Sequence, residues 1–147
     1  MAGRILIQED DIARLVRSLR RVAVLGIKTE AQTGQPAFDV PRYLQRQGME
    51  VVPVPVHDPE AERILGEPVF RRVQDVPGPV DCVDVFRRAT DLWPHLDDLK
   101  AARPRSVWLQ LGIRDDAFAQ ALAEAGIDVV QDRCLLVEHR RVSIHHS

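Results

Sequence analysis

The sequence predicts an α/β fold: a doubly wound, mainly parallel, Rossmann-like sheet in a single domain. Short apolar runs such as 22–26 show no alternation, as expected for strands buried on both faces of a parallel sheet. Amphipathic stretches with helical spacing separate these runs, and glycine or proline marks most of the turns between them. Strands that alternate with helices at this spacing form βαβ units with right-handed crossovers, so helices are expected on both faces of the sheet.

The first half of the chain predicts two helices and two strands. Residues 10–19 begin with acidic side chains and repeat apolar residues at helical spacing, so they form an amphipathic opening helix. The apolar run 22–26 is the first strand. A helix follows over 36–47, because a proline suits its first position and a glycine follows its end. The apolar run 50–54 is the second strand.

The second half repeats this alternation after a connection rich in turn residues. A short helix at 60–64 and a small strand at 69–70 are expected within that connection. The remaining elements are strands at 80–86, 106–111 and 127–130, and helices at 92–102 and 115–125.

The composition is that of one ordinary globular domain. The chain has 147 residues, of which 45% are hydrophobic and 29% are charged, values close to the average for folded proteins. We expect the domain to span residues 1–147, with a core over 20–137 and a frayed tail over 138–147. The net charge is −2 and the basic residues are dispersed, which argues against a nucleic-acid partner.

The sequence also indicates a compartment. Cys82 and Cys134 lie far apart and outside any CxxC pattern, so a disulfide is not expected. No apolar run approaches the roughly 20 residues of a membrane span, and the first residues lack a signal-peptide layout. We therefore expect a cytoplasmic protein with no membrane partner.

A ligand site is expected where the loops leave the carboxyl ends of the strands. In an open α/β sheet these loops meet on one rim and form the crevice in which ligands bind. Here they comprise residues 26–35, 55–57, 86–88 and 110–112. The first loop leads into a helix, whose free backbone N–H groups suit a phosphate. A nucleotide could therefore be held along this rim.

Two common nucleotide-binding motifs are missing from this sequence. The fingerprint G-x-G-x-x-G is broken because Lys28 replaces its second glycine, and Pro55 stands near the position of the acidic residue that closes the second strand. Asp58, a few residues farther along, keeps NAD as an alternative. The Walker pattern is also absent, which argues against an ATPase of that type.

Several segments resemble small stand-alone CoA-binding domain proteins in their order and spacing. The similar residues are Val22–Gly26, Phe38, Val40, Tyr43, Leu44, Gly48 and Val51–Val54 in the first half, and Ile64–Glu67, Pro79–Asp81, Val83–Arg88, Val107, Trp108, Gln110–Gly112, Val129, Val130 and Asp132–Cys134 in the second. That family is related to the N-terminal CoA-binding domain of the succinyl-CoA synthetase α subunit.

The resemblance implies that the chain binds coenzyme A or acyl-CoA through its nucleotide and pyrophosphate portion. In the first loop, it implies contacts with phosphate from Gly26, Ile27, Lys28 and Thr29. It implies that the nucleotide is flanked by Pro55, Val56 and His57 and covered by Phe86 and Arg87. It also implies that Gln110 lines the crevice. The family usually has Asn-Pro-Lys where this chain reads Pro55, Val56, His57, so one lysine contact is missing. The synthetase's phosphorylated histidine belongs to a domain absent from this sequence, so the expectation is binding without catalysis.

Several conspicuous residues have ordinary structural interpretations. Asp81 and Asp84 lie in an apolar strand and are expected to be hydrogen-bonded structural carboxylates. Cys82 and Trp108 are expected in the core, whereas Cys134 could be a more exposed thiol. His95 with its neighbouring aspartates, and the pair His145 and His146, lack the spacing of a zinc site, so no metal is expected.

Two other functions remain open at this point. One is an NAD(P)-linked or acyl-transferring enzyme, which requires a reactive group in the crevice. The other is an interaction module whose Rossmann-like sheet is only a scaffold for a partner protein or for a homodimer.

Overall fold

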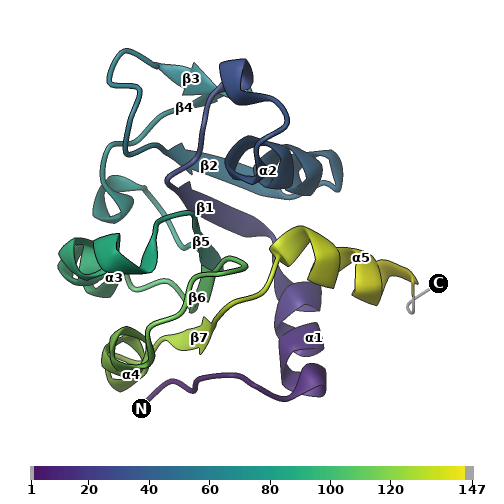
Figure 1. Ribbon diagram of the computed structural model, residues 1–147, viewed down its shortest axis with the longest axis vertical. Coiled ribbons are helices and arrows are strands. Elements are labelled where there is room, and N and C mark those ends of the chain that lie inside the picture. The colour runs from purple at the N-terminus through teal and green to yellow at the C-terminus, as the bar shows by residue number, and fades with distance from the viewer. Residues whose placement is uncertain (1, 145–147) are drawn as a thin grey trace.

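A computed structural model describes residues 2–144 of the chain, and its centre is a five-stranded parallel sheet (Figure 1). The order of the strands is β2-β1-β5-β6-β7. Their bounds are β1 Arg21–Leu25, β2 Glu50–Val54, β5 Cys82–Val85, β6 Ser106–Leu109 and β7 Asp128–Val130. The doubly wound, Rossmann-like α/β fold predicted from the sequence is confirmed.

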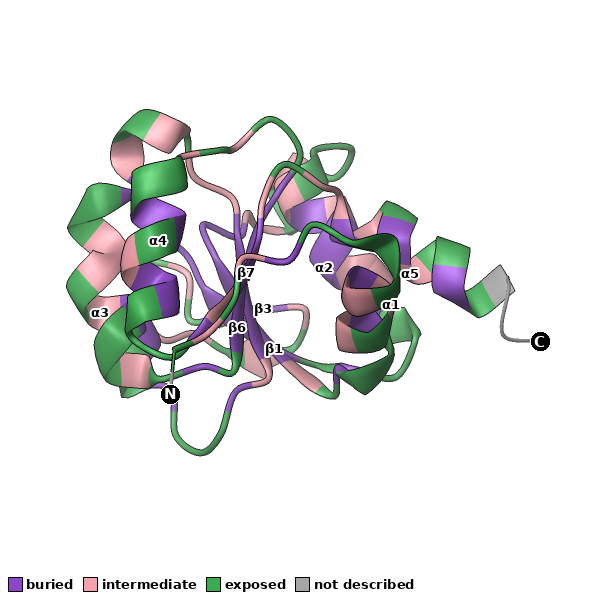
Figure 2. Ribbon diagram, turned by 90° about the horizontal axis from the view of Figure 1, so that it is seen from below, coloured by how far each residue is buried: buried purple, intermediate pink, exposed green. Residues whose placement is uncertain are grey.

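Helices cover both faces of the sheet (Figure 2). The helices of one face are α1 Glu9–Ser18, α2 Pro36–Arg46 and α5 Leu135–Ile144, and those of the other are α3 Leu96–Ala102 and α4 Asp116–Glu124. The strands are short apolar runs with side chains buried on both faces, which is why their sequences do not alternate.

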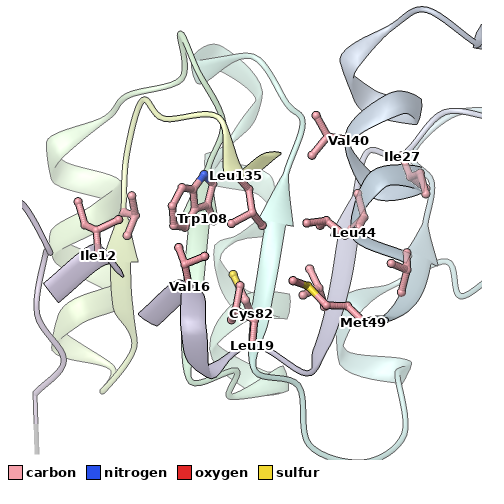
Figure 3. Close-up of a cluster of buried hydrophobic side chains, with 14 of the residues drawn as sticks. Ile12, Val16, Leu19, Ile27, Val40, Leu44, Met49, Cys82, Trp108 and Leu135 are labelled. Carbon is pink, nitrogen blue, oxygen red and sulfur yellow. The ribbon is translucent and has the colours of Figure 1, made fainter. Parts of the chain in front are cut away.

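The face that carries α1, α2 and α5 is packed around a single tryptophan (Figure 3). The Trp108 side chain is fully buried, and its indole N–H donates to the carbonyl oxygen of Arg133 at 2.7 Å. Leu135, at the start of α5, packs in the same cluster, as does Cys82. The core positions predicted for Cys82 and Trp108 are confirmed.

Two predictions about local structure are wrong. The expected helix at 60–64 and strand at 69–70 are replaced by a hairpin of β3 (Arg63–Ile64) and β4 (Glu67–Pro68). The expected tail from residue 138 is helical as far as Ile144, because α5 begins at Leu135 and packs on α1 and α2. His145 and His146 lie outside the described residues.

The segment before α1 covers the outer edge of β7. Ile5 forms a parallel bridge with Val129, the Leu6 N–H donates to the Val129 carbonyl oxygen at 2.8 Å, and the Val129 N–H donates to Arg4 at 2.9 Å. At the opposite edge, β2 contains Pro53, which has no N–H to offer, and its carbonyl oxygen accepts the N–H of Phe70 at 3.0 Å. Chain segments outside the sheet therefore cover the outer sides of both edge strands, β7 and β2.

Asp81 fastens the start of β5 to the start of β1. Its carboxylate accepts the backbone N–H groups of Arg20 at 2.8 Å and Arg21 at 2.9 Å, and the guanidinium of Arg105 at 2.8 Å. Partial burial alone would raise the pKa of Asp81, but the hydrogen bonds from Arg21 and Arg20 and the charge of Arg105 hold that pKa below its ordinary value. The prediction that Asp81 is a hydrogen-bonded structural carboxylate is confirmed.

We expect Asp81→Ala to lower the free energy of unfolding by about 2 kcal/mol at pH 7, because two backbone donors lose their charged acceptor. Since the pKa of Asp81 is lowered in the folded protein, its contribution is present above the unfolded value of 3.8 and is lost as the pH falls through the folded value. Urea unfolding at pH 7 and near pH 3 would measure this, and an equal deficit at both pH values would contradict it.

None of the helices within residues 2–144 combines the length and the apolar character that crossing a membrane requires.

Candidate functional site

From β1 the sheet grows to one side with β2 and to the other side with β5, β6 and β7, so the order of the strands reverses between β1 and β5. The loops that follow β1 and β5 lie side by side. β1 pairs with β2 on one side and with β5 on the other, so this is the topological switch point at which ligands bind in open α/β sheets. Gly26 follows β1, and Phe86 and Arg87 follow β5. The sequence therefore places these residues at one rim by strand order alone.

Gly26 allows the two loops to approach closely. Its φ is +86°, a conformation that residues with a side chain rarely adopt. A Cβ at this position would collide with the carbonyl oxygen of Phe86 and would lie 3.3 Å from Cδ of Arg87. The aliphatic stem of Arg87 thus lies beside the Gly26 backbone.

A cavity of about 340 Å³ opens at this junction. Its lining residues are Gly26, Lys28, His57, Phe86, Arg87, Arg88 and Asp91. They come from the loops that follow β1, β2 and β5, so three strand ends contribute to one hollow. Other hollows are larger, including one of about 550 Å³ beside the N-terminal segment, but they do not lie at the switch point.

Arg87 is a largely buried cation of this cavity. Its side chain is only 19% exposed, and its Nε is buried with no hydrogen-bond partner in the part of the chain that the structure describes. Its Nη2 lies 3.8 Å from Asp91, too far for a hydrogen bond. Asp91 is engaged instead by Arg88, whose Nε donates to it at 3.0 Å. A buried guanidinium with an unmet donor favours an anion in the cavity.

The residues predicted from the sequence divide into three groups. Gly26, Lys28, His57, Phe86 and Arg87 line the cavity together. Pro55 and Val56 line a neighbouring hollow of about 270 Å³.

The other predicted residues have structural surroundings. Ile27 is buried in the core. Thr29 caps a one-turn helix, η1 (Glu30–Gln32). Gln110 is buried, and its side-chain oxygen accepts the N–H of Leu135 at 3.1 Å, so it caps the start of α5. Their contact with a ligand stays a prediction.

Reasoning from the sequence missed one residue that lines the cavity and one that lies beside it. Asp91, which lines the cavity, stands four residues after Arg87, and this spacing on a helical turn was the available signal. His95 lines the neighbouring hollow and is half-buried. Burial and the charge of Arg87 lower the pKa of His95, although the carboxylates of Asp98 and Asp91 oppose this. His95 therefore lies within the electrostatic reach of the cavity.

Asp84 differs from the prediction made for it. In β5 it lies in register between Val24 of β1 and Trp108 of β6, fully buried. Within the described residues, neither of its carboxylate oxygens has a hydrogen-bond partner. Burial raises the pKa of this carboxyl well above its ordinary value. The prediction of a hydrogen-bonded structural carboxylate is therefore wrong for Asp84, although it is confirmed for Asp81.

Comparison with known proteins points to one family. A family model described as a CoA binding domain matches residues 20–140. A solved structure from Thermus thermophilus, cell-free ID.343, is 42% identical, has a TM-score of 0.83, and covers 92% of this chain and 99% of its own. The protein YneT of Bacillus subtilis (strain 168) is 27% identical over 129 residues, which are 88% of this chain and 92% of YneT.

A larger enzyme shares the fold. A dinucleotide-forming acetyl-coenzyme A synthetase of Ca. Korarchaeum cryptofilum, solved with phosphate and ADP, has a TM-score of 0.65 at 18% identity. The match covers 80% of this chain but only 27% of the synthetase chain. At this identity the likeness concerns the fold alone.

Proposed function

Since the chain belongs to the CoA binding domain family, we propose that it binds coenzyme A or acyl-CoA at the cavity between β1 and β5. The cofactor's diphosphate would lie against the Gly26 backbone and the Arg87 guanidinium. The protein would act as a binding module with no reaction of its own. The observation that carries this proposal is the buried Nε of Arg87, which lacks a partner within residues 2–144.

The charge of the cavity supports a ligand with several phosphates. Its lining contains the cations of Lys28, Arg87 and Arg88 and a single carboxylate, Asp91, which Arg88 already engages. Coenzyme A carries a diphosphate and a separate phosphate on its ribose, so it matches this excess of positive charge better than NAD does.

Isothermal titration calorimetry with CoA, acetyl-CoA and NAD tests the proposal. We expect saturable heat with the two CoA species and a weaker response, or none, with NAD. No heat with any CoA species at about 1 mM would contradict the proposal, because it limits the binding free energy to weaker than about −4 kcal/mol. Tighter binding of NAD than of CoA would favour the dehydrogenase alternative instead.

We expect Arg87→Gln to weaken CoA binding by about 10- to 100-fold, because a hydrogen bond between charged groups is lost from a partly desolvated site. The matched control is Arg46→Gln, which removes the same charge from the exposed end of α2. Both variants are titrated with CoA under identical salt. Equal affinities for the two variants would place the diphosphate away from Arg87.

A further inference from the structure

The loop that follows β1 is held by two kinds of hydrogen bond, local and long-range. Locally, the Lys28 N–H donates to Ala37 at 3.0 Å, Thr29 and Gln32 form a reciprocal capping box, and the Gly34 N–H donates to Asp39 at 3.0 Å. These bonds shape the loop but connect it only to its own helix.

Glu30 connects this loop to a distant segment. Its Oε2 accepts the backbone N–H of Leu65 at 2.8 Å, across 35 residues of sequence. Leu65 stands at the tip of the β3–β4 hairpin, where its φ is +55°. Figure 1 shows this hairpin beside η1, the one-turn helix that Glu30 begins.

The hairpin is itself a firm anchor. Ile64 is fully buried, the carbonyl oxygen of Leu65 accepts the side-chain amide of Gln45 at 2.9 Å, and β4 packs beside β2. Both backbone polar groups of Leu65 are therefore bound by side chains from the β1–α2 region. Among the described residues, the other hydrogen bonds of 27–35 stay within 27–39.

We propose that Glu30 is a positioning residue of the ligand site: by fixing its loop to the β3–β4 hairpin, it orients Lys28 toward the cavity. This inference rests on the proposed function. A loop that is ordered before binding loses less conformational entropy when the ligand arrives, so the ligand binds more tightly. Glu30 itself does not line the cavity, and its negative charge would repel an anionic ligand. Its role is therefore not a direct contact with the ligand.

Two substitutions separate the hydrogen bond from the charge. Glu30→Ala removes both, whereas Glu30→Gln removes the charge but keeps a side-chain oxygen that accepts the Leu65 N–H. We expect CoA to bind Glu30→Ala about tenfold more weakly than wild type, and Glu30→Gln within about twofold of wild type. Glu60→Ala is the control, because it deletes a carboxylate from the loop after β2 that forms no hydrogen bond or ion pair within the described residues.

Amide hydrogen exchange of Leu65 provides a readout without ligand. We expect its exchange to accelerate in Glu30→Ala and to stay slow in Glu30→Gln. Wild-type affinity in Glu30→Ala, despite faster exchange at Leu65, would overturn the inference and leave the CoA site intact. Equal weakening in both Glu30 variants would also overturn it, because the side-chain oxygen that Glu30→Gln keeps for the Leu65 N–H would then not be what positions the loop. Absence of CoA binding by the wild type would overturn the proposed function, and this inference with it.

Discussion

Gly26→Ala is expected to lower the free energy of unfolding by about 3 kcal/mol and to abolish CoA binding. Two costs combine at this residue. An alanine at φ +86° is strained, and its Cβ would collide with the backbone carbonyl of Phe86, which cannot move as a flexible side chain would. Any relief must separate the loops after β1 and β5, and this separation would move Arg87 away from the Gly26 backbone.

Gly112→Ala is the control that carries the backbone strain without the collision. Gly112 has a φ of +85°, almost identical to that of Gly26, but a Cβ there would meet no atom within 4 Å. Urea unfolding of both variants should show the larger loss for Gly26→Ala. CoA titration should show lost binding in Gly26→Ala and wild-type affinity in Asp81→Ala, whose change lies at the other end of the strands, where β1 and β5 begin. Equal stability of the two glycine variants would show that the loops do not approach as closely as described.

Asp84→Asn is expected to raise the free energy of unfolding by about 2 kcal/mol at pH 7. The wild-type carboxyl is fully buried between Val24 and Trp108, and within the described residues nothing pairs with it. Ionisation is therefore costly in the folded protein and free in the unfolded chain. The amide has almost the same shape and cannot ionise, so the packing around Trp108 is kept.

The pH dependence of Asp84→Asn distinguishes this explanation from a change in packing. Because the folded pKa of Asp84 is raised, the folded state binds the proton more tightly than the unfolded chain does. The stability of the wild type therefore falls as the pH rises from the unfolded value of 3.8 toward the folded value, by up to about 1.4 kcal/mol per pH unit.

Denaturant unfolding between pH 4 and pH 8 should thus show little advantage for Asp84→Asn in acid and a growing advantage toward neutrality. Asp81→Ala should behave oppositely, with its deficit largest near neutrality. A constant difference between Asp84→Asn and wild type across this range would show that Asp84 does not ionise on unfolding.

The sheet could be predicted because its strands are short apolar runs whose burial on both faces is visible in the sequence. The β3–β4 hairpin could not, since a strand of two residues has no periodicity to recognise. The sequence predicts a tail over part of helix α5 because the interactions that hold this helix come from residues distant in the sequence, which local patterns do not reveal. Gln110 caps the N–H of Leu135, and the Leu135 side chain enters the core beside Trp108.

The candidate site was predictable to the same extent as the strand order. Gly26 and Arg87 each follow a buried strand, and parallel strands end at one rim, so their meeting follows from the topology. The difference between Asp81 and Asp84 did not follow, because both are aspartates in one apolar segment. Asp81 lies where β1 begins and free N–H groups are available, whereas Asp84 lies where Val24 and Trp108 offer no donor to it.

The covered edges of the sheet constrain how copies of this protein could assemble. Ile5 and its neighbours cover the outer side of β7, and Phe70, which donates to the carbonyl oxygen of Pro53, covers that of β2. A continuous sheet running from one copy into the next would first have to displace one of these segments. A homodimer of the intact fold would therefore associate through its helices or its loops, and strand-by-strand fibre growth is opposed at both ends.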